Sequence, residues 1–200
     1  VEGVPSVRIV VTAYPKELAE KWVDIFSQAG ITVIALMSES QALAQSLVSK
    51  DDTRTAVLVN FFKDKTIIAI VSQGFVRFAT TVSHNPENAE KILESHEGER
   101  IVESVELLAV RDEVRKVFSY WVSKQKVKSL KDPNAIRAII VSGHVSNMSD
   151  VTEYLGKKVS TPAMLGNVWV NAFSLDKYVP ELEFEESLSF AAAAGAALPK

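Results

Sequence analysis

One polar turn in the sequence has the residue types of a nucleotide-binding site. It reads Ser142-Gly143-His144, follows the apolar run Ala135–Val141 and continues into an amphipathic stretch. A strand that ends in a small-residue turn before a helix offers free backbone N–H groups, which bind phosphates and other anions. His144 departs from this pattern, because a second small residue there would let a ligand come close. The turn therefore indicates either a nucleotide site or the remains of one.

The composition argues against several other kinds of chemistry. There is no cysteine, so disulfides and cysteine metal sites are excluded, and His84, His96 and His144 are too far apart for a metal-ligand motif. The net charge of −3 argues against a nucleic-acid partner, since the one basic cluster, Lys124–Lys131, is typical of a solvated helix end. No run of 18 apolar residues exists, so no membrane span is expected.

The first 50 residues predict the order strand–helix–strand–helix. Ser6–Ala13 and Ile31–Met37 are rich in β-branched residues and are expected to be strands. A helix is expected from Lys16, with Gly30 as the glycine that follows its last turn. A second helix is expected over Ser38–Lys50, because Ser and Gln at the first and fourth positions form a capping-box pattern.

From residue 51 onward the pattern changes to three strands followed by alternating helix and strand. The second and third strands are joined by Gln73-Gly74, a two-residue hairpin signal. The expected strands are Ala56–Phe61, Thr66–Ser72, Phe75–Val82 and Ala135–Val141, and the expected helices are Asn85–Leu130, Ser149–Val159 and Glu185–Leu198. In the long helical region the apolar positions expected to face the core are Ile101, Val105, Leu108, Val114, Val117, Phe118 and Trp121. This order predicts an α/β protein with a ribonuclease-H-like core.

Several segments, taken in order, carry a resemblance to a known family. They are VRIVVTAYPKELAEKW, TAVLVNFFKDKTIIAIV, DEVRKVFSYW, IRAIIVSGHVSNMSDVTEYL and SLSFAAAAGAALPK. Together they resemble the later part of the PilM family of type IV pilus assembly proteins, relatives of FtsA within the actin-like ATPases. The resemblance implies a mixed sheet flanked by helices. It also implies that residues 1–50 are a remnant of the first actin-like half, and that residues 51–200 are the second half, with a reduced helical insertion at about 85–130.

The resemblance also identifies a second ligand motif, in which the family has Asp-x-Gly-x-x-x-Thr around the nucleotide phosphates. The matching residues here are Asn60, Phe62 and Thr66. Asparagine lacks the negative charge that a divalent ion favours, and phenylalanine adds bulk where backbone N–H groups would meet the phosphates. In the family's adenosine motif, Ser142 and Gly143 match, but His144 replaces the second glycine. These losses predict a degenerate ATPase that is not an enzyme and needs no cofactor.

The function that the resemblance implies is a non-catalytic scaffold of a type IV pilus or related secretion system. It would be cytoplasmic and peripheral to the inner membrane, bound to the cytoplasmic N-terminal peptide of a protein similar to PilN. The matching surface would include Ile9, Val11 and Trp22, where an extended peptide could add to a strand edge. The sequence leaves open whether the protein forms a homo-oligomer.

Two other functions stay open. In one, a segment preceding Val1 completes a nucleotide pocket and the protein works as an actin-like ATPase with ATP and Mg²⁺. In the other, the chain is an adaptor of a different envelope machine that makes no use of a nucleotide.

Overall fold

The computed structural model describes residues 11–84, 105–144, 147–174 and 176–198, and the chain forms two compact units, residues 1–38 and 39–200. The predicted strand Ser6–Ala13 lies mostly outside the described residues, and Val11–Ala13 are not part of a strand. The predicted helix is confirmed as α1, Lys16–Gln28. It ends at Gly30 (φ +73°), where the N–H groups of Gly30 and Ile31 bond the carbonyls of Ser27 and Phe26. This is the Schellman pattern that a glycine after the last helical turn predicts.

The predicted strand at Ile31–Met37 is wrong. These residues are irregular, and Ile34 is 95% exposed. A strand exists only where its backbone groups bond a neighbouring strand. The described part of the first unit contains no such neighbour, so β-branched composition alone does not make a strand here.

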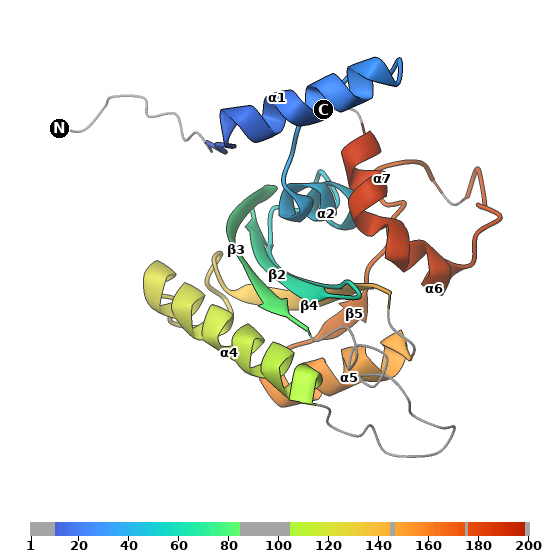
Figure 1. Ribbon diagram of the computed structural model, residues 1–200. Coiled ribbons are helices and arrows are strands. Elements are labelled where there is room, and N and C mark those ends of the chain that lie inside the picture. Colours follow the sequence, from blue (N-terminus) through green and yellow to red (C-terminus); the bar gives the residue numbers. More distant parts are fainter. Residues whose placement is uncertain (1–10, 85–104, 145–146, 175, 199–200) are drawn as a thin grey trace, which may run out of the picture. The chain divides into compact units, whose positions relative to one another are not determined.

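The second unit is built on a mixed sheet of five strands in the order β3-β2-β1-β4-β5. The strands are β1 (Thr55–Phe61), β2 (Lys65–Ser72), β3 (Phe75–Ser83), β4 (Ile136–Gly143) and β5 (Ala163–Leu165). β1, β2 and β3 form an antiparallel meander, whereas β4 and β5 run parallel to β1 (Figure 1). All four predicted strands of this region are confirmed. β5 was not predicted, because three residues are too few to show a period.

The predicted hairpin between β2 and β3 is also confirmed. Both turn residues have positive φ, 56° at Gln73 and 75° at Gly74. Two consecutive residues with positive φ are the mark of a type I′ turn, whose twist matches that of the strands it joins.

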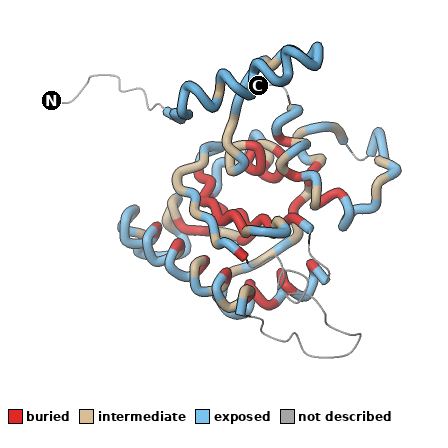
Figure 2. The backbone as a smooth tube through the Cα atoms, viewed as in Figure 1, coloured by how far each residue is buried: buried red, intermediate tan, exposed pale blue. Residues whose placement is uncertain are grey.

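Helices cover both faces of the sheet (Figure 1). α4 (Val105–Gln125) and α5 (Met148–Val159) pack on one face, and α2 (Glu39–Leu47) and α7 (Ala191–Ala197) lie over the other. Figure 2 shows that the buried residues lie in the central strands and on the helix sides that face them, and every residue of β1 is buried. The predicted class, a mixed sheet flanked by helices, is therefore confirmed.

Helix α4 differs from the prediction in the burial of its first described turns and at its C-terminal end. The residues from 85 to 104 lie outside the described part, and in the first turns Leu107 and Val110 are buried instead of Val105 and Leu108. From Val114 onward the predicted core positions hold, with Val114, Val117 and Trp121 buried. The helix stops at Gln125 rather than Leu130.

The stop has a backbone cause that the sequence did not signal. Lys126 has φ +53°, and the N–H groups of Lys126 and Val127 bond the carbonyls of Ser123 and Val122. This is the same helix-ending pattern as at Gly30, but formed by a lysine. Because no glycine marks this position, the sequence predicts a longer helix than the one that forms.

The closing helix, predicted as continuous over Glu185–Leu198, is divided into three parts. These are α6 (Phe184–Ser187), a 3₁₀ turn (Leu188–Phe190) and α7. The Ser187 hydroxyl donates a 2.6 Å hydrogen bond to the Phe184 carbonyl, a local bond that competes with regular helix geometry.

Helix α2 belongs to the second compact unit, which begins at Glu39. The reason is its close contact with α7. A Cβ atom on Gly195 would lie 1.7 Å from the carbonyl oxygen of Ala42, so glycine is required for the two helices to approach.

Candidate nucleotide-binding edge

The parallel pairing of β1 with β4 brings the two sequence motifs together. Asn60 lies opposite Ser142, and Phe61 lies opposite Gly143, while Thr66 of β2 pairs with Phe61 from the other side. The predicted ligand residues therefore lie at one edge of the sheet, which we call the nucleotide edge. Ligands of open α/β sheets bind at this kind of edge, outside the carboxyl ends of parallel strands.

At the centre of this edge, two polar side chains bond each other. The Ser142 hydroxyl donates to the Asn60 side-chain oxygen across 2.7 Å, and both residues are buried. A carboxylate at position 60 would present charge for a metal-bound water, whereas this amide oxygen is already occupied by a hydroxyl. The pair joins β1 to β4 and is satisfied without a ligand.

Gly143 is explained by packing alone. Its φ is +114°, and a Cβ atom there would lie 2.1 Å from the carbonyl oxygen of Phe61 and 2.5 Å from its nitrogen. Only glycine allows β4 to approach β1 this closely. The retained glycine of the motif is thus needed for the sheet whether or not a nucleotide binds.

The Thr66 hydroxyl, which the resemblance assigns to a phosphate oxygen, contacts a residue that the sequence did not connect with it. His84 Nε2 lies 2.6 Å from Thr66 Oγ1, and both residues are buried. His84 follows β3 directly, and its N–H donates to the Asp64 carbonyl. The register of the β2–β3 hairpin could have indicated this contact. It places Val82 opposite Thr66, and His84 lies two residues beyond Val82.

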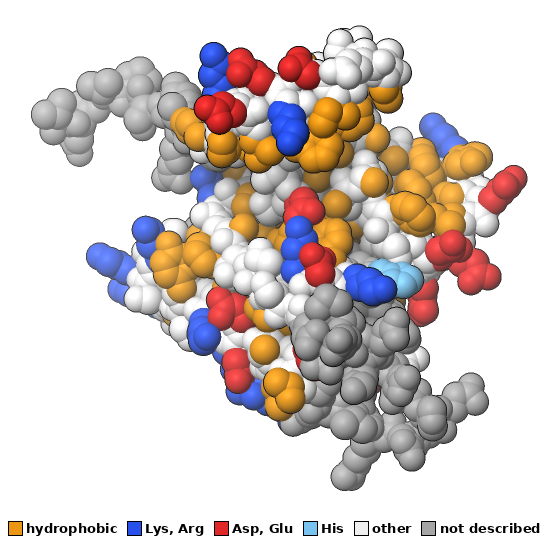
Figure 3. Space-filling view, in the orientation of Figure 1, with side chains coloured by type: hydrophobic (Ala, Val, Ile, Leu, Met, Phe, Trp, Pro, Cys, Tyr) orange, Lys and Arg blue, Asp and Glu red, His pale blue; other side chains and the backbone are white. Residues whose placement is uncertain are grey.

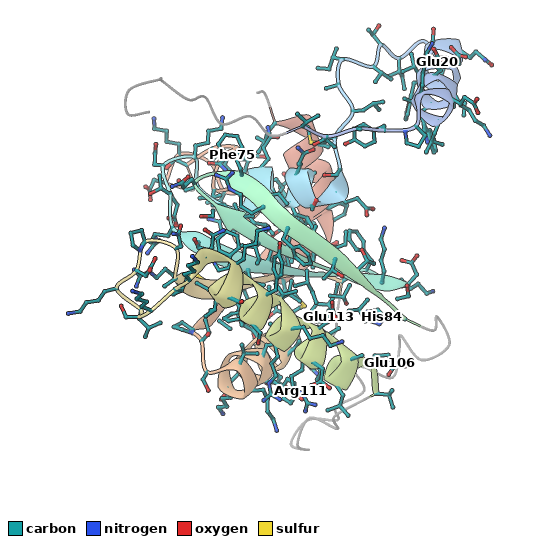
Figure 4. The ribbon with its side chains drawn as sticks, turned by 90° about the vertical axis from the view of Figure 1, so that its left-hand side faces the viewer. Glu20, Phe75, His84, Glu106, Arg111 and Glu113 are labelled. Carbon is teal, nitrogen blue, oxygen red and sulfur yellow. The ribbon has the colours of Figure 1, made fainter. Side chains whose placement is uncertain are left out.

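Burial lowers the pKa of His84 below its usual range, and the charges of Glu106 and Asp64 oppose this shift. Figure 4 shows His84 at the end of β3 and Glu106 nearby at the start of α4. Among the described residues, His84 Nδ1 has no hydrogen-bond partner. A neutral imidazole therefore occupies the space beside Thr66.

Phe62 stands where a glycine would open the hairpin toward phosphates. Its N–H donates to the Lys65 carbonyl across 2.7 Å, which closes the turn. Its ring packs against the core and lies 5.2 Å from the Lys65 ammonium, which also forms a 2.6 Å ion pair with Glu39. This backbone donor and this cation are thus both engaged within the protein.

His144 lies exposed at the rim of the same edge. Its N–H donates to the Phe61 carbonyl at 3.0 Å, and its Nδ1 lies 3.2 Å from the Ser189 hydroxyl. The contact with Ser189 ties the turn after β4 to the closing helical segment. His144 therefore has protein partners on both its backbone and its ring.

The residues predicted to bind a partner peptide lie in the first unit. Ile9 is outside the described residues, Val11 is 77% exposed, and Trp22 is 49% exposed on α1, with its ring 6.2 Å from that of Phe26. No residue of α1 is buried, and Figure 3 shows hydrophobic side chains gathered on this helix. The strand edge that was predicted to receive the peptide is not formed by the described residues 11–13.

Within the described residues no cluster of three or more His, Cys, Asp or Glu side chains is placed to bind a metal ion. The helices of that same part are too short or too polar to cross a bilayer.

Comparison with known proteins gives structural matches only. No protein-family model and no curated protein matches the sequence. Among solved structures, a chain of a PilM-PilN type IV pilus biogenesis complex superposes with a TM-score of 0.65 at 11% identity over 91% of this chain and 57% of its own length. EutJ, an ethanolamine utilization protein from Carboxydothermus hydrogenoformans, matches with a TM-score of 0.51 at 12% identity, over 92% of this chain and 61% of its own.

MreB5 of Spiroplasma citri bound to AMPPNP matches with a TM-score of 0.52 at 10% identity, over 92% of this chain and 64% of its own. These likenesses show the actin-like ATPase fold. The chain spans less than two thirds of the length of these structures.

Proposed function

We propose that this chain is part of a PilM-like, non-catalytic scaffold at the cytoplasmic side of a type IV pilus or related assembly platform. The observation that carries the proposal is the closed nucleotide edge. Asn60 is bonded to Ser142, and Thr66 is bonded to His84, so the side chains that would hold a nucleotide hold each other instead. The likeness to a chain of the PilM-PilN complex supports the choice of pathway.

Nucleotide binding at this edge would replace hydrogen bonds within the protein by hydrogen bonds to the ligand. A nucleotide phosphate that bonded Thr66 would have to displace a buried histidine and leave its ring nitrogen without a partner. An unsatisfied buried polar group costs roughly 1–3 kcal/mol. Asn60 carries no charge that would bind a metal ion, so few interactions with a nucleotide at this edge could offset that cost.

The test is a titration of the protein with a fluorescent ATP analogue and Mg²⁺. We expect no saturable binding at the nucleotide edge of the parent chain. The triple variant Asn60→Asp, Phe62→Gly, His144→Gly should bind, because it restores the acid and the two small residues of the motifs. If the parent binds as tightly as the triple variant, the edge is not degenerate.

The partner is proposed to be the cytoplasmic N-terminal peptide of a PilN-like inner-membrane protein. The exposed apolar residues of α1 offer a surface of suitable chemistry, and Trp22 is its largest side chain. Trp22→Ala should weaken binding of this peptide about tenfold or more, since aromatic anchors dominate peptide interfaces.

Tyr178→Ala is the matched control for Trp22→Ala, because Tyr178 is an aromatic residue of the second unit with 57% exposure. Equal peptide binding by the parent and Trp22→Ala would place the peptide elsewhere. A peptide that bound neither would remove the pilus partner from the proposal.

A second candidate is a nucleotide-dependent protein whose pocket is completed by a further part of a longer chain. It is favoured by the positive φ of Gly143 at the end of β4 and by α5 as the next helix along the chain, the strand–turn–helix order that the resemblance assigns to an adenosine motif. Saturable ATP binding by a longer form of the protein, weakened by Asn60→Ala but not by Arg137→Gln, would support this candidate over the scaffold.

A further inference from the structure

The end of the sheet opposite the nucleotide edge contains a cavity of about 380 Å³. It is lined by Thr53, Arg54, Gln73, Pro133 and Arg137. These residues come from the start of β1, the β2–β3 turn and the start of β4, so three separate parts of the chain meet there. Figure 4 shows how far this end lies from the nucleotide edge, with Phe75 and His84 at opposite ends of β3. We call this region the arginine edge.

Arg54 forms a two-point ion pair with a nearby carboxylate. Its Nε and Nη2 donate to the two carboxylate oxygens of Asp52 at 2.9 and 2.8 Å. A guanidinium has five N–H donors, so this fork leaves further donors for a ligand.

Arg137 carries a charge without a matching anion. Its Nη2 donates to the backbone carbonyl of Asp132 at 3.2 Å, and it forms no ion pair with any carboxylate of the described residues. The Asp132 carboxylate instead accepts from the Asn134 N–H. No lining residue of the cavity is acidic.

A third guanidinium lies next to the lining. Arg77 Nη2 donates to the side-chain oxygen of Gln73 at 3.3 Å, and its carbon Cζ lies 5.4 Å from the centre of the Phe75 ring. Three arginines therefore gather at this end, and only Arg54 is neutralised by a carboxylate partner. The surplus positive charge is unexpected in a chain with a net charge of −3.

The loop on the far side of the cavity is fixed by a buried tryptophan. Trp121 Nε1 donates to the Asn134 carbonyl at 2.7 Å, which holds the loop that contains Pro133. The basic segment Lys124–Lys131 leads directly into this loop, and Figure 3 shows Lys and Arg side chains gathered at that end of α4. The sequence alone indicates that Lys124–Lys131 is a solvated helix end. In the structure this segment adds positive charge next to the arginine edge.

We propose that the cavity at the arginine edge binds a phosphate group, either of a free phosphate compound or of an anionic lipid headgroup. Guanidinium groups match phosphate oxygens with paired N–H bonds. A phosphate monoester carries about −1.5 to −2 charges and three acceptor oxygens, which suits several arginines better than the single charge of a carboxylate. The Thr53 hydroxyl and the Gln73 amide supply further polar groups at the lining.

The test measures binding of inorganic phosphate and pyrophosphate by calorimetry, and binding to vesicles of phosphatidylcholine with and without phosphatidic acid, whose headgroup is a phosphate monoester. The variants are Arg137→Gln and Arg54→Gln. Arg115→Gln is the matched control, because Arg115 is an exposed arginine on α4 that bonds the Lys158 carbonyl and takes no part in the cavity. We expect each cavity variant to bind about tenfold more weakly or worse, and the control to bind as the parent does.

The arms of the experiment separate the sources of the phosphate. Binding of the soluble anions alone assigns a phosphate compound, and binding to phosphatidic acid vesicles alone assigns a lipid headgroup. No binding in either arm, or equal binding by the parent and both cavity variants, overturns the proposal. Binding of poly-glutamate but of neither phosphate source overturns it too. If Arg137→Gln lowers the unfolding midpoint, Arg54→Gln at the exposed rim decides the outcome.

The proposal is independent of the scaffold function, since no residue of the nucleotide edge takes part in it. It also sharpens the ATP titration. ATP that binds through its phosphates at the arginine edge would lose affinity in Arg137→Gln but not respond to the triple variant of the nucleotide edge.

Discussion

The polar side chains at the two ends of the sheet differ in how completely they are hydrogen-bonded within the protein. At the nucleotide edge, Ser142 donates to Asn60, and Thr66 contacts His84, in bonds between buried residues. At the arginine edge, Arg54 and Arg137 line a cavity and keep donors that no side chain of the described residues uses up. A polar group that is satisfied within the protein contributes to stability, whereas one with donors to spare can bind a ligand.

The comparison shows that the presence of a motif residue is not the same as its availability. Gly143 and Thr66 match the family's ligand motifs, yet one is needed for strand packing and the other is covered by a histidine. The arginines belong to no motif, and their ligand-binding chemistry follows only from their position. If this contrast is correct, substitutions at the nucleotide edge should change stability, and those at the arginine edge should not.

The largest expected effect is that of Gly143→Ala. The added Cβ would lie 2.1 Å from a backbone oxygen at φ +114°, so the strands must separate or the backbone must change. We expect a loss of about 3–5 kcal/mol in the free energy of unfolding, measured by denaturant titration. Gly74→Ala, at the hairpin turn with φ +75° but nothing within 4 Å, should cost only about 1–2 kcal/mol. Equal losses would show that β1 and β4 can separate freely.

The Asn60–Ser142 pair should behave as an ordinary structural bond. Ser142→Ala removes the donor and leaves the buried amide oxygen without a partner, so we expect a loss of roughly 1–3 kcal/mol. Ser72→Ala is the matched control, because Ser72 accepts a 2.9 Å bond from the Thr55 hydroxyl and both residues are buried in the sheet. A gain in stability on Ser142→Ala alone would instead indicate a strained site kept for function.

His84 should make stability depend on pH. Because its pKa in the folded state is lowered by burial, the unfolded state binds more protons once the pH falls below the unperturbed pKa of 6.5. Its contribution is therefore complete above pH 6.5 and is lost as the pH falls through the lowered pKa. The free energy of unfolding of His84→Gln should fall less than that of the parent between neutral and mildly acidic pH. The same substitution at the exposed His144 serves as the control, and identical slopes for parent and His84→Gln would place the acid sensitivity elsewhere.

The smallest expected effect is that of Arg54→Gln on stability. Arg54 is solvent-exposed, and exposed ion pairs such as Arg54–Asp52 contribute little because water and salt screen them. The unfolding midpoint should stay within the error of the measurement. A clear drop in the midpoint would mean that Arg54 stabilises the fold, and the contrast between the two ends of the sheet would then be wrong.

Much of the second unit could be predicted because its signals are local. The hairpin at Gln73-Gly74, the strands on either side of it and the phase of α4 from Val114 onward follow from a few neighbouring residues. The errors occurred where local signals were absent or misleading. Lys126 ends α4 in a conformation that usually requires glycine, and Ile31–Met37 has strand composition but no strand beside it among the described residues.

The residues of the candidate site were named from two separate local motifs. Their meeting is a finding of the structure, in which the parallel pairing of β1 with β4 places Asn60 opposite Ser142. The role of His84 was not visible, because it depends on how β3 continues past its register with β2.

By itself, the sequence determined the four longer strands of the mixed sheet, the hairpin turn, and the presence of an asparagine and a phenylalanine at positions 60 and 62. These follow from the side chain or the backbone freedom of single residues. Only the tertiary structure decided that Thr66 is covered by His84, and that Arg54 and Arg137 face one cavity. Residues 18 and 83 positions apart along the chain meet because strand pairing brings them together, and no local pattern records such a meeting.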